Sequence, residues 1–150
     1  MRLGVKPADD PTITGSLAAI DATIKVTAPQ GALWYRYNHD GYGERADGSP
    51  YTGQGIGRLW PLLSGERGEY AVARGLPASG YLRALSGSAN QGGMLPEQVW
   101  DRADAAGFRF GQGTGSATPL AWAHAQFVRL AVSISAGRNV ETPSIVDARY

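Results

Sequence analysis

The sequence predicts a single all-α domain, residues 1–150, in which long glycine-rich loops separate the helices. Apolar residues recur at spacings of three and four over several stretches, as they do along one face of a helix. The 21 glycines and 9 prolines interrupt these stretches instead of forming low-complexity runs, which favours shaped loops over disorder. With 43% hydrophobic residues, the chain is long enough to bury a sizeable core.

The first helix is expected to begin at Asp10-Pro11, where a capping side chain precedes a proline at the first helical position. Apolar residues then recur at spacings of four, three and four, and we expect this face to pack in the core. It contains Ile13, Leu17, Ile20 and Ile24. Pro29-Gln30-Gly31 is expected to end the segment.

Two further helices are expected in the middle of the chain. One contains Leu59 and Trp60, tolerates Pro61 in its first turn and continues to Tyr70. The break at Gly75-Leu76-Pro77 then precedes a helix that directs its apolar residues inward. These residues are Tyr81, Leu82 and Leu85.

The last third of the chain predicts a short helix that contains Asp101 and stops at Gly107, and a long helix from Pro119 to about Ala136. The long helix has two apolar sides, so we expect it to pack on both. One side contains Leu120, Ala123, Phe127, Leu130 and Ile134, and the other contains Trp122, Val128 and Val132. The tail from Pro143 to Tyr150 is expected to be extended.

Composition excludes several classes of protein. A net charge of +1 with scattered basic residues argues against binding to nucleic acid or to an anionic membrane. The absence of cysteine excludes disulfides and thiolate chemistry. No apolar run is long enough to span a membrane, and the start of the chain has no signal peptide core. As it stands, the chain is therefore expected in the cytoplasm.

Glu97 is the main catalytic candidate. Gly92-Gly93 allows a sharp turn before it, and apolar neighbours such as Leu95 and Trp100 would remove water from its carboxylate. Such surroundings tune a carboxylate for proton transfer, with Gln98 as a supporting donor. The alternative is a structural glutamate that begins a helix after proline.

An aromatic loop over residues 33–44 is the candidate binding segment. Aromatic rings stack on the C–H groups of sugars, and arginine and carboxylates bind the hydroxyls. The candidate side chains are Tyr35, Arg36, Tyr37, Asp40 and Glu44. They could equally belong to a well-packed structural loop. His39 beside two acids is weak evidence for a metal site, and no metal is expected.

Two glycine-rich stretches resemble parts of a dinucleotide-binding fingerprint. Neither Gly53–Gly57 nor Gly111–Ser116 follows a convincing strand. The second stretch precedes a helix start, where backbone N–H groups favour an anion such as a phosphate. An NAD(P) site that uses Gly111, Gly113, Gly115 and Ser116 therefore stays open as an alternative.

Four blocks in order carry a family resemblance: RYNHDGYGE, GRLWPLLSGERGEY, GGMLPEQVWD and GTGSATPLAWAHAQFVRL. Together they resemble the C-terminal part of bacterial glucoamylases and glucodextranases of glycoside hydrolase family 15. The resemblance covers nearly the whole chain from Leu3. It implies part of a six-hairpin α/α toroid, an inverting reaction without a cofactor, Glu97 as the general base, and Arg36 and Trp60 in the glucose pocket.

The same resemblance implies that one catalytic group is missing. The family's general acid lies in an earlier part of the domain, and a toroid needs about twelve helices, whereas this sequence predicts four main helices and a short one. An inverting site needs two carboxyl groups roughly 6.5–9.5 Å apart. We therefore expect weak or no hydrolysis by this chain alone. The alternative activity is an NAD(P)-dependent oxidoreductase that acts on alcohol or sugar hydroxyls.

A partial toroid is also expected to self-associate, as a dimer or a larger homo-oligomer. Exposing about 800 Å² of apolar surface would forgo roughly 20 kcal/mol of burial as an upper bound. Folded domains are stable by only about 5–15 kcal/mol. A third hypothesis is a helical fragment that has no catalytic role.

Overall fold

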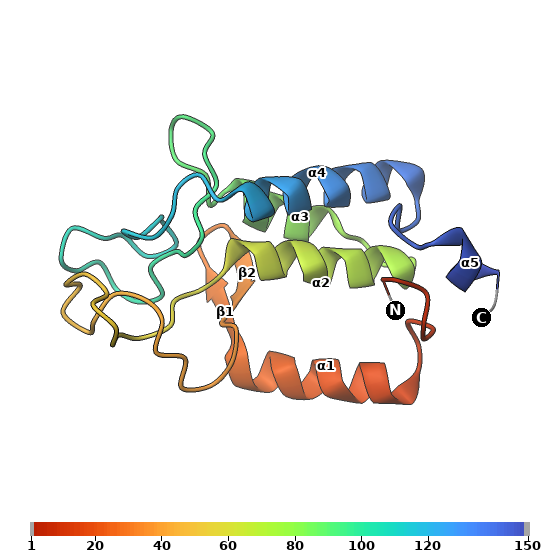
Figure 1. Cartoon of the computed structure of the whole chain (residues 1–150), viewed down its shortest axis with the longest axis horizontal. Coiled ribbons are helices and arrows are strands. Elements are labelled where there is room, and N and C mark those ends of the chain that lie inside the picture. The colour runs from red at the N-terminus through yellow and green to blue at the C-terminus, as the bar shows by residue number, and fades with distance from the viewer. Residues whose placement is uncertain (1, 149–150) are drawn as a thin grey trace.

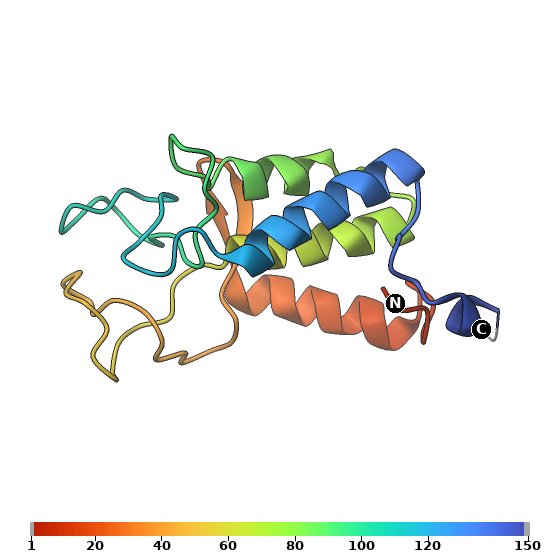
Figure 2. The same cartoon turned by 45° about the horizontal axis from the view of Figure 1, so that its top comes forward.

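The computed structural model describes residues 2–148 and is mostly helical, as the sequence predicts. Its elements in order are α1 (Pro11–Ile24), β1 (Lys25–Ala28), β2 (Gly31–Trp34), α2 (Pro61–Ala73), α3 (Ser79–Ser86), α4 (Ala121–Ala136) and the one-turn α5 (Ser144–Asp147). Helix α2 lies between α1 on one side and α3 and α4 on the other (Figures 1 and 2). The long loops gather at one end of the helices, and the helices extend away from them in the other direction (Figure 1).

A β-hairpin follows α1, which the sequence analysis missed. Strands β1 and β2 pair antiparallel, with Lys25 opposite Trp34 and Ala28 opposite Gly31. Gly31 has a φ of 136°, a conformation that favours glycine. The aromatic segment expected to be a loop from Leu33 onward thus begins inside a strand. Short strands lack enough periodicity to be distinguished from the end of a helix.

The apolar face of α1 is not in the core, contrary to expectation. None of the α1 residues is buried, and Ile20 is 40% exposed. The helix begins where predicted, with the Asp10 side chain accepting the Thr12 N–H at 2.8 Å. Asp21 connects α1 to the rest of the fold by accepting from Trp34 Nε1 at 3.0 Å and from an Arg67 Nη at 2.9 Å.

The best-packed part of the fold is the contact between α2, α3 and α4. Two glycines of α2 allow α4 to approach closely. A Cβ on Gly65 would lie 2.3 Å from Cγ of Gln126, and one on Gly68 would lie 2.6 Å from a Leu130 methyl. Leu130 is completely buried there, and Leu85 of α3 is buried beside α4 in a neighbouring cluster. Helix α4 ends as predicted, with Gly137 in the left-handed conformation at its C-terminus.

The second apolar side of α4 is exposed, which corrects the prediction that both sides are packed. Trp122 is 57% exposed, Val128 59% and Val132 48%. Among residues 2–148, none of the helices combines the length and the apolar character that a membrane crossing requires.

Other predicted elements differ in detail. The short helix expected around Asp101 is absent: residues 101–107 form bends and a turn, which a bridge between Ala105 and Phe108 closes. Leu59 and Trp60 precede α2 instead of belonging to it. The tail, expected to be extended, contains α5. The end of that tail, residues 149–150, lies outside the described residues.

Candidate functional site

A ladder of short bridges assembles the loop end of the molecule. Trp34 pairs with Trp60, Leu59 pairs with Val99, and Val99 pairs with Gly113. Leu59, Val99 and Leu33 are completely buried, so the ladder lies on a core of its own. The segments that carry Arg36, Trp60, Glu97 and the second glycine-rich loop are thereby held side by side. The helices lie on one side of this arrangement of loops (Figure 1).

Arg36 and Asp40 form the charged pair of the site. Nε and an Nη of Arg36 donate to the two carboxylate oxygens of Asp40, both at 2.7 Å. Burial alone would raise the pKa of Asp40, but the hydrogen bonds from Arg36 and from the Tyr42 N–H lower it below its usual range. The Arg36 guanidinium lies 4.8 Å from the ring centre of Trp60. Asp40 therefore fixes Arg36 in place as a permanently charged donor.

Aromatic rings surround Arg36 on several sides. Tyr42 and Tyr37 lie 5.0 and 5.3 Å from its guanidinium. Tyr37 is 56% exposed and Tyr42 36%, so both offer ring surface to a ligand. Trp60 is only 4% exposed and is covered by Arg36, so it supports the arginine instead of facing solvent.

Glu97 lies beside this cluster. The Tyr42 hydroxyl donates to its Oε2 at 3.0 Å, and this hydrogen bond, followed by burial, raises the pKa of Tyr42. Glu97 is half-buried and does not begin a helix; its N–H donates to the Ala117 carbonyl at 2.8 Å. The expected apolar enclosure is incomplete, because Met94 is 42% exposed while Leu95 turns into the core. A tyrosine hydroxyl, instead of apolar bulk, is therefore the closest partner of this carboxylate.

Gln98 and Glu44 lie in the same region but hold loops together. The Gln98 Oε1 accepts the Arg58 N–H at 2.9 Å, and Gln98 is 1% exposed. Glu44 Oε1 accepts the Gly115 N–H at 2.7 Å, and Glu44 is also buried. Both side chains thus border the site without facing the Arg36 cluster.

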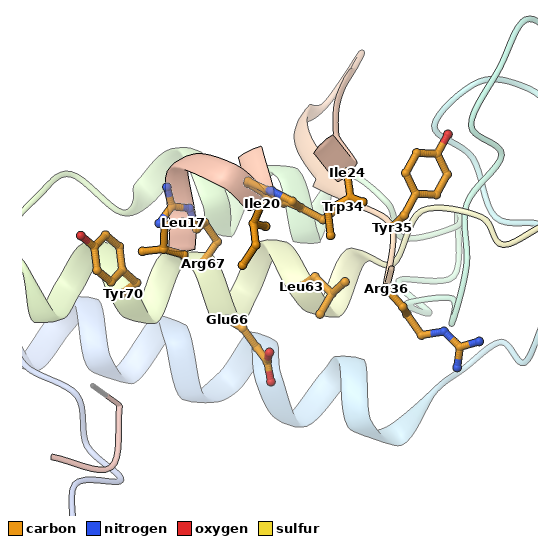
Figure 3. Close-up of a pocket in the computed structure, with 10 residues that line it drawn as sticks. All are labelled: Leu17, Ile20, Ile24, Trp34, Tyr35, Arg36, Leu63, Glu66, Arg67 and Tyr70. Carbon is orange, nitrogen blue, oxygen red and sulfur yellow. The ribbon is translucent and has the colours of Figure 1, made fainter. Parts of the chain in front are cut away.

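Tyr35 points away from the cluster. It follows Trp34 in extended backbone, so its ring and the Arg36 side chain project in different directions (Figure 3). Its hydroxyl donates to Asp101 at 2.8 Å, and burial together with this hydrogen bond raises the pKa of Tyr35 to about 12. Of the predicted binding residues, the structure therefore brings together Arg36, Tyr37, Asp40, Trp60 and Glu97.

Arg58 is the principal residue that sequence reasoning missed. It is completely buried, donates to Asp101 Oδ1 at 2.7 Å, and lies 4.1 Å from the ring centre of Trp100. It also donates to the carbonyls of Glu44 and Arg45, at 2.6 and 2.7 Å, which anchors the aromatic loop. An arginine after a glycine-rich stretch reads as a surface residue, so no local signal marks it.

The glycine-rich loop Gly111–Ser116 uses its donors inside the protein. The N–H groups of Gly111, Thr114 and Gly115 donate to Trp100 O, Gln98 O and the Glu44 carboxylate. Ser116 Oγ accepts the Gln98 N–H at 2.9 Å. Helix α4 begins only at Ala121, beyond the loop. The nucleotide site stays a prediction, and quenching of tryptophan fluorescence by NAD(P) is the measurement that tests it.

Within residues 2–148, no group of three or more histidine, aspartate or glutamate side chains is arranged to hold a metal ion. His39 is exposed, with a positive φ of 58°. The site is built from two carboxylates, Asp40 and Glu97, the arginine that Asp40 fixes, and aromatic rings. Exposed aromatic rings beside a few fixed polar groups are the usual composition of a small-molecule site.

Comparison with known proteins identifies the family. The model of glycosyl hydrolases family 15 matches residues 1–132, and the chain belongs to this family. It is 50% identical over 150 residues to a glucoamylase of Clostridium sp. (strain G0005). A crystal structure of a bacterial glucoamylase complexed with acarbose superposes on 99% of this chain with a TM-score of 0.91 and 50% identity. A structure described as a wild-type glycosidase matches 92% of the chain with a TM-score of 0.63 and 27% identity.

The similarity covers only part of each relative. The chain spans 20% of the Clostridium glucoamylase, 21% of the acarbose-bound structure and 33% of the glycosidase. It therefore corresponds to a fragment of a family 15 domain. Because the match to the acarbose-bound structure is close over nearly all residues, the fragment has the conformation that this larger glucoamylase has.

Proposed function

We propose that residues 1–150 form a saccharide-binding part of a glucoamylase-type catalytic domain, with Glu97 as the base that activates water. The observation that supports this most directly is the cluster of Arg36, Tyr42 and Glu97. Arg36 is fixed by Asp40, and Tyr42 links the arginine to the carboxylate. A sugar would stack on Tyr37 and Tyr42 while Arg36 donates to its hydroxyls.

Hydrolysis by these residues alone should be weak or absent. An inverting reaction needs a carboxylic acid opposite the base, on the leaving oxygen. The acids nearest to the cluster are already used: Asp40 is paired with Arg36, and Glu44 accepts from Gly115. Losing one proton-transfer partner costs a factor of about 10² to 10⁴ in rate. No cofactor enters this proposal.

Binding can be tested without catalysis. We expect acarbose and maltose to give heat on titration into the wild-type chain. Arg36→Ala should weaken binding about ten- to hundred-fold, because it removes a charged donor. Arg83→Ala in α3 is the control: it removes a positive charge at a position away from the site, and this variant should bind the saccharides like the wild type. Unchanged affinity in Arg36→Ala would refute the proposed pocket.

The role of Glu97 is tested by residual hydrolysis. A sensitive assay with maltose or an aryl glucoside should give a low rate for the wild-type chain and a lower rate for Glu97→Gln. Binding of acarbose should persist in Glu97→Gln, because the amide keeps the size of the side chain. Equal rates in the two proteins would remove Glu97 from the mechanism.

We also propose that the 150 residues fold as one domain that self-associates. Support comes from the exposed apolar side of α4 and from the absence of any buried residue in α1. Exposed apolar faces of this kind mark surfaces that associate with another protein surface.

A further inference from the structure

The start of α4 binds the segment that precedes Glu97. The Leu95 N–H donates to Nε2 of His124 at 3.0 Å, and the Leu95 carbonyl accepts the Leu120 N–H at 2.9 Å. Leu120 and His124 lie about one helical turn apart, and the His124 N–H donates to the Leu120 carbonyl at 3.2 Å. Both backbone polar groups of Leu95 are therefore bound by a single turn of this helix.

The imidazole of His124 is an acceptor in this contact. A backbone N–H is always a donor, so Nε2 carries no hydrogen, and the proton of the neutral ring lies on Nδ1. Leu95 is 3% exposed, and its side chain packs with Leu85 and Ala123. Without the imidazole, the Leu95 N–H would be buried with no partner, which is costly for a backbone donor.

The connection from Leu95 to Glu97 is short and stiff. Only Pro96 lies between them, and its ring fixes φ near −65°. Pro96 is buried against the second glycine-rich loop, where a Cβ on Gly113 would lie 3.3 Å from the Pro96 Cβ. The Glu97 N–H donates to the Ala117 carbonyl at 2.8 Å. A displacement of Leu95 would therefore pass to the backbone of Glu97.

The chain on the other side of Leu95 forms a turn that is closed by Asn90. Its Oδ1 accepts the N–H groups of Gly92 and Met94, at 2.9 and 3.1 Å, and its own N–H donates to the Met94 carbonyl at 3.0 Å. These bonds join residues 90–94 to one another, so they shape the turn without fixing it on the helices. The contacts of Leu95 with α4 place this turn relative to the helices.

We infer that His124 is a positioning residue for the base. Its neutral imidazole holds the Leu95 N–H and thereby keeps the Glu97 carboxylate beside the Tyr42 hydroxyl. The inference rests on the proposed role of Glu97, although the contact itself concerns position and not catalysis. All the groups involved belong to residues 90–124, so the contact does not depend on what else the protein contains.

Tyr42 reports the position of Glu97 without any need for catalysis. Its hydroxyl donates to Glu97 Oε2 at 3.0 Å, and this hydrogen bond is the main cause of the raised pKa of Tyr42. If the carboxylate moves away, the pKa of Tyr42 should fall toward its ordinary value. An NMR titration of the assigned Tyr42 ring resonances measures this change.

Two substitutions at position 124 separate positioning from packing. His124→Leu keeps apolar bulk and removes the acceptor, whereas His124→Gln keeps an oxygen that can accept. In His124→Leu, the amides of Leu95 and Glu97 should exchange with solvent about tenfold faster, and the pKa of Tyr42 should fall. His124→Gln should restore both measurements. Val128→Ala, at an exposed position of the same helix, is the matched control and should behave like the wild type.

The opposite results overturn the inference. Unchanged exchange of the Glu97 amide and an unchanged pKa of Tyr42 in His124→Leu would show that packing of Leu95 alone holds the loop. Failure of His124→Gln to restore them would show that the acceptor is not the relevant property. Far-UV circular dichroism checks that the variants fold. If His124→Leu does not, nitrogen-15 NMR of the wild-type ring decides, since a hydrogen on Nε2 would exclude the contact.

This inference and the proposed function can fail separately. Equal hydrolysis by the wild type and Glu97→Gln would remove Glu97 from the mechanism, while the amide exchange and the Tyr42 titration would still show whether His124 holds the loop. A His124→Leu variant with unchanged exchange and titration, together with a lower rate in Glu97→Gln, would leave Glu97 as the base and remove His124 as its positioning residue.

Discussion

Buried charges at the loop end show how single residues shape this site. Arg58 is completely buried, and the Asp101 side chain is 3% exposed, so the pair lies out of contact with water. Each partner has further hydrogen bonds: Tyr35 donates to Asp101, and Arg58 donates to two loop carbonyls. A buried ion pair adds little net stability, but removing one partner leaves an unpaired charge. We therefore regard this pair as the anchor of the loop that carries Arg36.

Asp101→Asn should destabilise the fold by about 3 kcal/mol, because the buried Arg58 loses its closer carboxylate, at 2.7 Å, and keeps only that of Glu44, at 3.9 Å. Urea unfolding at neutral pH measures this, and Asp9→Asn at an exposed position is the control. A loss no larger than that of the control would contradict the anchoring role.

The same pair predicts a pH dependence. Burial would raise the pKa of Asp101, but the hydrogen bonds from Tyr35 and Arg58 lower it below its usual value. A carboxyl whose folded pKa is lowered stabilises the fold above its unfolded pKa of about 4, and this contribution is lost as the pH falls through the folded pKa. Wild type should therefore lose more stability than Asp101→Asn between pH 5 and acid pH, in urea unfolding series.

At the scale of elements, glycines set how closely the helices approach. Gly65 and Gly68 of α2 face Gln126 and Leu130 of α4 without room for a Cβ. Gly15 of α1, by contrast, has no atom within 4 Å of where its Cβ would be. Glycine therefore allows close packing in α2, whereas in α1 it only lowers the stability of the helix.

Replacing these glycines by alanine should have opposite effects. Gly65→Ala should destabilise the fold by about 1–3 kcal/mol through overpacking against Gln126. Gly15→Ala should stabilise it by about 0.5–1 kcal/mol, since alanine favours the helix and meets nothing. Thermal unfolding of the two variants measures the difference. A stabilising Gly65→Ala would mean that α2 and α4 are not in close contact.

At the scale of the molecule, two helix faces that carry apolar residues are exposed to solvent. Helix α1 buries none of its residues, and α4 exposes its valines. Association of copies would cover them.

Self-association should make thermal stability depend on concentration. Binding between folded copies stabilises the folded state by mass action, so the unfolding midpoint should rise as the protein concentration rises. Calorimetry over a dilution series measures this shift. A midpoint that stays constant for the wild type over the dilution series would contradict self-association.

Local sequence determined the four main helices and the family. Pro11 and Pro61 mark helix starts, Gly137 marks an end, and the spacing of apolar residues indicates the segments between them, because these signals act within a few residues. The four motif blocks led to the same family that the comparisons show. Tertiary structure alone decided the exposure of the α1 face, the buried Arg58 and the pairing of Tyr42 with Glu97. Each depends on contacts between segments distant in sequence, and no local pattern records which segments will meet.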